Sequence, residues 1–180
     1  AEVGTRSQVG GVLLFSRKNQ APAQLSELIK EIRKISPEIR LAVDHGGGRG
    51  QRFQQGFTKI PAMHGLGHLY YQDKKRALHA ARETAWLLAT ELLVADIDLS
   101  FAPVLDLDHS LSQVIGDRAF SGDPSVVIEL GRAFIDGFHD AGMAATGKHF
   151  PGHGGVSGDS HTDIPVDRRS WSEIESTDLQ

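Results

Sequence analysis

The chain has 180 residues, of which 39% are hydrophobic and 23% are charged, a composition typical of one globular domain or part of one. Its net charge of −4 gives no electrostatic reason to expect nucleic acid or an anionic membrane as a partner, and the absence of cysteine excludes disulfides and thiolate metal sites. No apolar run approaches the roughly 18 residues of a membrane span, so we predict a soluble, cytoplasmic protein with a small ligand and an undetermined oligomeric state.

The first half of the chain alternates strand and helix patterns. The apolar run 10–15 is typical of a strand buried on both faces, and helical spacing of apolar residues predicts a helix over 22–35. A second short strand is expected at 40–44. After a glycine-rich loop, a long helical pattern covers 77–97.

The second half continues the alternation, with a strand at 99–106 that again ends in an aspartate, a helix at 123–142, a strand at 143–146 and the start of a helix in 167–180. This order predicts an α/β fold with a parallel sheet, either an open doubly wound sheet or a closed barrel. In both architectures, active sites lie at the carboxyl ends of the strands.

The glycine-rich loop from Asp44 to Arg52 places two arginines and a carboxylate around four glycines. The glycines would let the backbone approach a ligand, while Asp44 accepts hydrogen bonds and Arg49 or Arg52 donates them. The alternative is a flexible surface turn with solvated arginines. Another loop carries Arg118, which could form either a structural ion pair or a ligand contact. No Lys-Ser or Lys-Thr follows the glycines, which disfavours nucleotide binding.

The densest polar segment is the loop 148–161, Lys-His-Phe-Pro-Gly-His-Gly-Gly-Val-Ser-Gly-Asp-Ser-His. One interpretation makes His149, His153, Asp159 and His161 the ligands of a catalytic zinc-like ion. A second interpretation pairs Asp159 with His161, so that the carboxylate holds one ring nitrogen and the other nitrogen transfers a proton. In a third, the histidines only satisfy backbone carbonyls. Spacing alone leaves the first two interpretations close to equal.

The 148–161 loop, together with Phe-Ala-Pro-Val-Leu-Asp at 101–106 and Ile-Gly-Asp-Arg at 115–118, resembles family 3 glycoside hydrolases of the β-N-acetylhexosaminidase branch. The resemblance implies a (β/α)8 barrel and retaining hydrolysis of terminal non-reducing β-linked N-acetylglucosamine from muropeptide-type substrates. It implies that His161 is the acid/base with Asp159 as its partner, and that no metal or other cofactor takes part. The residues that would hold the sugar are Asp44, Arg52, Arg118, Lys148 and His149.

The sequence departs from that family's pattern at His45, Gly46 and Gly50, where glutamine, glutamate and valine are usual. The resemblance also implies a nucleophilic aspartate on a later strand, after the 148–161 loop. We therefore expect residues 1–180 to be one partial catalytic barrel domain, about half of a barrel, with its first and last strands missing and with negligible activity alone. The alternatives to the glycosidase are a metal-dependent hydrolase that uses the loop histidines, or an inactive, truncated sugar-binding module.

Overall fold

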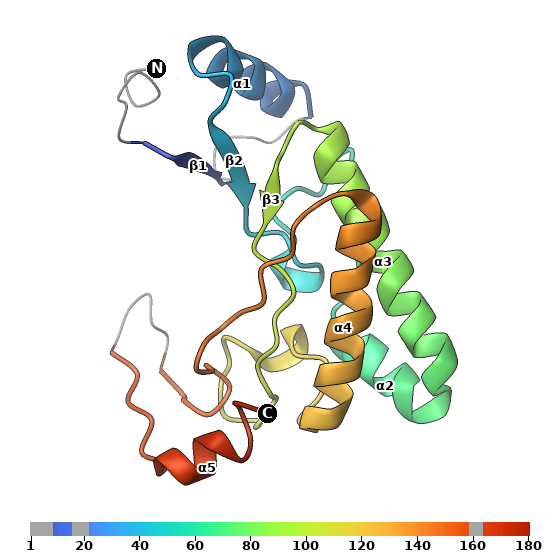
Figure 1. Ribbon diagram of the computed structural model, residues 1–180, viewed down its shortest axis with the longest axis vertical. Coiled ribbons are helices and arrows are strands. Elements are labelled where there is room, and N and C mark those ends of the chain that lie inside the picture. Colours follow the sequence, from blue (N-terminus) through green and yellow to red (C-terminus); the bar gives the residue numbers. More distant parts are fainter. Residues whose placement is uncertain (1–8, 16–21, 159–163) are drawn as a thin grey trace.

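The computed structural model describes residues 9–15, 22–158 and 164–180, and it has the predicted α/β architecture (Figure 1). Three parallel strands form a sheet in the order β1 (Gly11–Leu14), β2 (Arg40–Val43) and β3 (Leu99–Ser100). In its register, Leu13 lies opposite Ala42, which in turn lies opposite Leu99. The predicted parallel sheet is confirmed.

The third and fourth predicted strands are less regular than the sequence pattern indicated. The regular strand β3 ends at Ser100. Further along, the segments 101–106 and 143–148 lie side by side and are joined by one parallel bridge, between Val104 and Lys148. The Leu105 amide donates to the Lys148 carbonyl at 2.5 Å, and the Lys148 amide donates to the Pro103 carbonyl at 3.1 Å. Pro103 has no N–H to give to a ladder, which is one physical reason that the regular strand stops before it.

Three helices match their predicted segments: α1 (Pro22–Ile35), α3 (Lys74–Val94) and α4 (Pro124–Ala141). Helices α3 and α4 begin at aspartate N-caps, since the Asp73 side chain accepts from the Arg76 amide and the Asp123 side chain accepts from the Ser125 amide. Helix α2 (His64–Gln72) was not predicted. The predicted C-terminal helix is reduced to the single turn α5 (Trp171–Glu175).

Helices α3 and α4 run side by side along one flank of the molecule (Figure 1). Their backbones approach closely at Gly137, where a Cβ atom would lie 2.2 Å from the carbonyl oxygen of Arg82. The exposed ion pairs Arg82–Asp140 and Lys74–Glu129 join the same two helices. Close backbone approach and ion pairs thus hold the two helices together.

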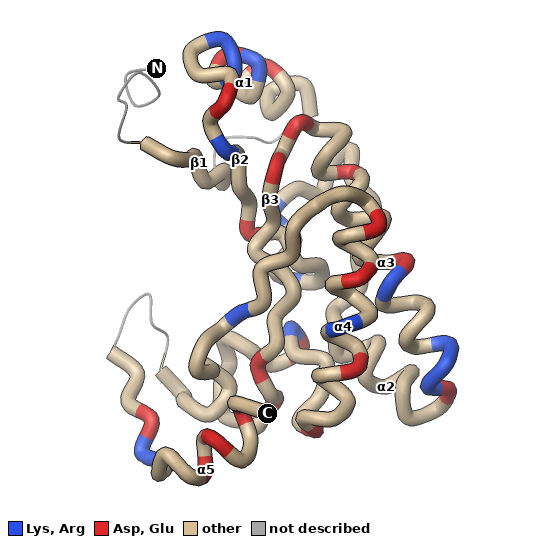
Figure 2. The backbone as a smooth tube through the Cα atoms, viewed as in Figure 1, with Lys and Arg blue, Asp and Glu red and all other residues tan. Residues whose placement is uncertain are grey.

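Figure 2 shows basic and acidic residues interspersed over the outer helices α1, α3 and α4. Within the described residues, no helix is long and apolar enough to cross a membrane. The helix surfaces therefore carry charges of both signs, as is usual for residues exposed to water.

Candidate active site

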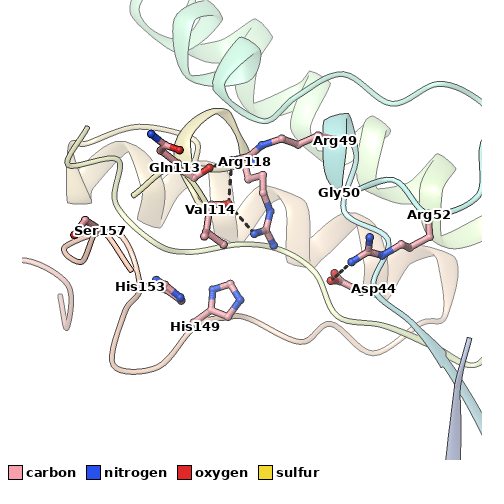
Figure 3. A pocket seen from close by; sticks show the side chains of 10 residues that line it. All are labelled: Asp44, Arg49, Gly50, Arg52, Gln113, Val114, Arg118, His149, His153 and Ser157. Atoms are coloured by element: carbon pink, nitrogen blue, oxygen red, sulfur yellow. Dashed lines mark hydrogen bonds and ion pairs between the residues drawn. The ribbon is translucent and has the colours of Figure 1, made fainter. Parts of the chain in front are cut away.

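The carboxyl ends of the strands open onto a pocket of about 780 Å³ (Figure 3). Asp44 directly follows β2, and Lys148 lies at the end of the segment that pairs with Val104. Of the residues predicted to hold a sugar, Asp44, Arg52, Arg118 and His149 line the pocket, and Lys148 contacts Asp44 beside it. The other residues of its lining are Arg49, Gly50, Gln113, Val114, His153 and Ser157.

Asp44 is the centre of the pocket's charge network. Its Oδ1 lies 2.5 Å from the Lys148 ammonium, and its Oδ2 lies 3.3 Å from the Arg52 guanidinium. Two cations from chain segments about a hundred positions apart thus meet on one carboxylate. The sequence prediction that these three side chains lie together is consistent with this geometry.

Burial disfavours the charged forms of Asp44 and Lys148, whereas the attraction between their opposite charges favours these forms. Burial alone would raise the pKa of Asp44, but the hydrogen bond from Lys148 and the charges of Lys148 and Arg52 hold it below its usual value. For Lys148, burial lowers the pKa despite the bond to Asp44, and nearby Arg118 adds repulsion. Three cations therefore surround one carboxylate, and the pocket offers more donors than acceptors.

The wall opposite the histidines is fixed by arginines of the glycine loop and of η4 (Gly116–Arg118). The Arg49 Nε donates to Asp117 at 2.8 Å, and its Nη2 donates to the carbonyls of residues 113, 114 and 115. Arg118 Nη1 donates to the Val114 carbonyl at 3.0 Å. Arg49 thus holds the glycine-rich loop against residues 113–117. Arg118 lines the pocket on the same side.

His149 and His153 reach the pocket from the loop that follows Lys148, with ring centroids 5.9 Å apart (Figure 3). Behind them lies Asp106, whose buried carboxylate is 2.6 Å from the His149 Nδ1. Sequence reasoning noted an aspartate at the end of this strand but gave it no role. Its position at a strand end was the available signal, whereas its partner lies 43 positions further along the chain.

Of the three departures from the family pattern, Gly50 lines the pocket, whereas His45 and Gly46 do not. His45 is buried, packs against Phe53 and Phe57, and accepts a hydrogen bond from the Phe53 amide on Nδ1. At Gly46 a Cβ atom would meet only Ala102, at an ordinary contact distance of 3.7 Å. The glycine loop keeps its order without the usual glutamate, since the Gly46 amide donates to the Gly50 carbonyl at 3.3 Å.

The predicted acid/base pair, Asp159 and His161, lies outside the described residues. Among the residues that are described, no group of three or more histidines, aspartates or glutamates is placed to hold a metal ion. The structure therefore leaves the pairing of Asp159 with His161 as a prediction.

Comparison with known proteins places the whole chain in one group. Residues 1–180 match the family model described as the glycosyl hydrolase family 3 N terminal domain. A beta-hexosaminidase from Tolumonas auensis is 56% identical over 179 residues, which cover 99% of this chain and 52% of that protein.

Solved structures give the same result. Native NagZ from Neisseria gonorrhoeae superposes with a TM-score of 0.89 at 49% identity, over 94% of this chain and 50% of that chain. The same protein in complex with N-trifluoroacetyl-D-glucosamine also gives a TM-score of 0.89 at 49% identity, over 94% of this chain and 51% of that one. The chain spans about half the length of the relatives it matches.

Proposed function

The chain belongs to glycosyl hydrolase family 3, and from that premise we propose that its pocket holds the terminal sugar of a β-linked N-acetylglucosaminide that the protein hydrolyses with retention of configuration. The observation that carries the proposal is the convergence of Asp44, Arg52, Arg118 and His149 around one pocket, with Lys148 on Asp44. These residues come from three separate segments of the chain. Family membership and the NagZ complex with a glucosamine derivative support the same class of ligand.

The polar groups of the pocket suit a sugar. A hydroxyl group both donates and accepts hydrogen bonds, so it can give its proton to the Asp44 carboxylate while its oxygen accepts from Lys148 or Arg52. In the free protein these groups satisfy one another through the ion pairs. A bound sugar would insert its hydroxyls into this network without leaving a charge unpaired.

We propose that proton transfer is carried out by His161, with Asp159 as the partner that orients it. In the sequence, Asp159 follows the pocket residue Ser157 by two positions. In a retaining reaction a carboxylate attacks the anomeric carbon while His161 gives its proton to the departing oxygen, and His161 then takes a proton from the water that releases the sugar. The resemblance assigns the attacking carboxylate to an aspartate beyond residue 180.

Muropeptide-type compounds, which are fragments of peptidoglycan, are the substrates we propose, with the cytoplasm as the place of action. The resemblance to the β-N-acetylhexosaminidase branch of the family, whose bacterial enzymes act in peptidoglycan recycling, supports both. The excess of cations in the pocket is compatible with a substrate that carries carboxylates.

The test is the hydrolysis of aryl N-acetyl-β-glucosaminides by the full-length protein, with the anomer of the first product read by NMR. We expect β-N-acetylglucosamine to appear first. His161→Ala should slow poor leaving groups by about 10²- to 10⁴-fold and activated leaving groups much less. Equal loss on both kinds of substrate would contradict the acid/base role. Sugar binding without any turnover by the full-length protein would identify a sugar-binding module instead.

A further inference from the structure

Asp106 has no part in the proposed sugar contacts, yet it is one of the most deeply buried charged groups near the pocket. Its side chain is 0% exposed, and it lies directly behind His149. Burying a carboxylate lowers the stability of the fold unless hydrogen bonds to the carboxylate compensate for the lost contact with water.

The compensation comes from the loop that carries both pocket histidines. Asp106 Oδ2 accepts from the His149 amide at 3.1 Å and lies 2.6 Å from the His149 Nδ1, while Oδ1 accepts from the His153 amide. Burial by itself would raise the pKa of Asp106, but these bonds hold it below its ordinary value. The carboxylate is thus ionised and can only accept.

An acceptor so close to the His149 Nδ1 requires the proton of a neutral imidazole to be on that nitrogen. The other ring nitrogen, Nε2, then carries a lone pair. The His149 side chain is 34% exposed and lines the pocket, so this nitrogen is left for a ligand.

We propose that Asp106 is a positioning residue that fixes the proton of His149 on Nδ1, so that Nε2 accepts a hydrogen bond from a hydroxyl of the bound sugar. The inference rests on the proposed function, which supplies the sugar as the ligand. It adds that, in the hydrogen bond between the sugar and His149, the sugar hydroxyl donates and the ring nitrogen accepts. Of the five residues proposed to hold the sugar, Arg52, Arg118 and Lys148 can only donate, so Asp44 and His149 are the two that can accept from hydroxyl protons. A hydroxyl replaced by hydrogen or by a methyl ether would lose this bond.

Asp106→Asn tests the arrangement because an amide cannot accept on both sides. With its NH2 group at the Oδ2 position, asparagine would donate to His149 Nδ1, move the ring proton to Nε2 and face the backbone N–H of His149. With its NH2 group at the Oδ1 position, it would face the N–H of His153. Asp108→Asn is a matched control, since Asp108 Oδ1 accepts from the Ser110 amide, and the amide oxygen of asparagine can accept the same bond.

The experiment is ¹⁵N NMR of the histidine rings in the full-length protein, at a pH where His149 is neutral and with His149→Gln used to assign its signals. We expect the Nδ1–H tautomer in the wild type and in Asp108→Asn, and a shift toward Nε2–H in Asp106→Asn. On addition of N-acetylglucosamine, the wild-type Nε2 signal should move. Asp106→Asn should lower kcat/KM by roughly 10- to 100-fold, mainly through KM.

The wild-type spectrum alone decides the inference even if Asp106→Asn fails to fold. The Nε2–H tautomer at His149 in an active enzyme would overturn it and leave the proposed function intact. An Nδ1–H tautomer whose Nε2 signal ignores N-acetylglucosamine would overturn the sugar contact. A protein without glycosidase activity whose Nε2 signal does respond to the sugar would refute the hydrolase proposal and support the contact.

Discussion

His45 is expected to make the stability of this protein sensitive to mild acid. Its side chain is 1% exposed and packs against two phenylalanine rings, with its Nδ1 accepting from the Phe53 amide. Burial lowers the pKa of His45 from 6.5 to about 4. Between these values the unfolded chain binds a proton that the folded chain excludes, so the free energy of unfolding decreases as the pH falls.

The size of this effect follows from linkage. Relative to neutral pH, a single group with these two pKa values costs about 2 kcal/mol of stability at about pH 5 and about 3 kcal/mol near pH 4. Carboxylates also titrate in the lower part of this range, so the comparison is best made from pH 7.5 down to about 5. Across that interval His45 should be a dominant cause of any acid-induced loss.

The perturbation is His45→Gln, which brings in the residue usual in the family at this position and does not titrate. Its amide oxygen can accept from the Phe53 amide, while the smaller side chain lowers stability by a pH-independent amount. Denaturant unfolding of the full-length protein at several pH values gives the slope for each form. His79→Gln, at a ring that is 75% exposed, is the matched control.

Between pH 7.5 and about pH 5, we expect the free energy of unfolding of the wild type and of His79→Gln to fall by about 2 kcal/mol more than that of His45→Gln. Parallel pH dependences for wild type and His45→Gln would refute the reasoning, because they would mean that His45 titrates alike in the folded and unfolded states.

Further predictions concern packing and the arginine that fastens the pocket wall. Gly67→Ala should destabilise the fold by about 3 kcal/mol because its Cβ would lie 1.8 Å from the Phe120 carbonyl oxygen. In the same helix, a Cβ at Gly65 would meet nothing within 4 Å, so Gly65→Ala should stabilise the fold by about 0.5–1 kcal/mol. Thermal unfolding of both variants checks the pair, and equal shifts would contradict the close contact. Arg49→Met removes the ion pair with Asp117 and the bonds to three carbonyls, so limited proteolysis should cut that loop faster in a protein that remains folded. An unchanged cleavage rate would show that Arg49 does not hold the loop.

Much of the architecture was predictable from local patterns. The short strand β2 and the helical spacing of α1, α3 and α4 reflect burial of their apolar residues, and the structure confirms these elements. Strand β1 also forms as predicted, but the prediction that it is buried on both faces is wrong, since Gly11 and Leu13 are exposed and only Leu14 is buried. It pairs with β2 alone among the described strands, so one side of it has no neighbour to cover it. Helix α2 was missed because its two glycines and the absence of a side-chain cap weaken its local signal, and packing of Gly67 on the backbone at Phe120 supplies what the sequence pattern lacks.

The candidate pocket was predictable where a residue follows a strand end, because parallel strands bring their carboxyl ends to one edge. Asp44 and Lys148 illustrate this rule. Asp106 also ends a predicted strand, which was the available signal that it lies near the site. Its pairing with His149, 43 positions further along the chain, depends on the three-dimensional path of two loops and could not be read from the sequence. The complete burial of His45 likewise depends on Phe53 and Phe57 folding over it.

The central claim is that the pocket around Asp44 binds N-acetylglucosamine, and calorimetric titration of the full-length protein with this sugar tests it most directly. Asp44→Asn should weaken binding roughly 10- to 100-fold, since Lys148 and Arg52 lose their common carboxylate and a hydroxyl loses its acceptor. The control Asp96→Asn, at an exposed carboxylate paired with Arg33 before β3, should bind like the wild type. Equal affinity in Asp44→Asn and the wild type, or no binding by the wild type, would contradict the account.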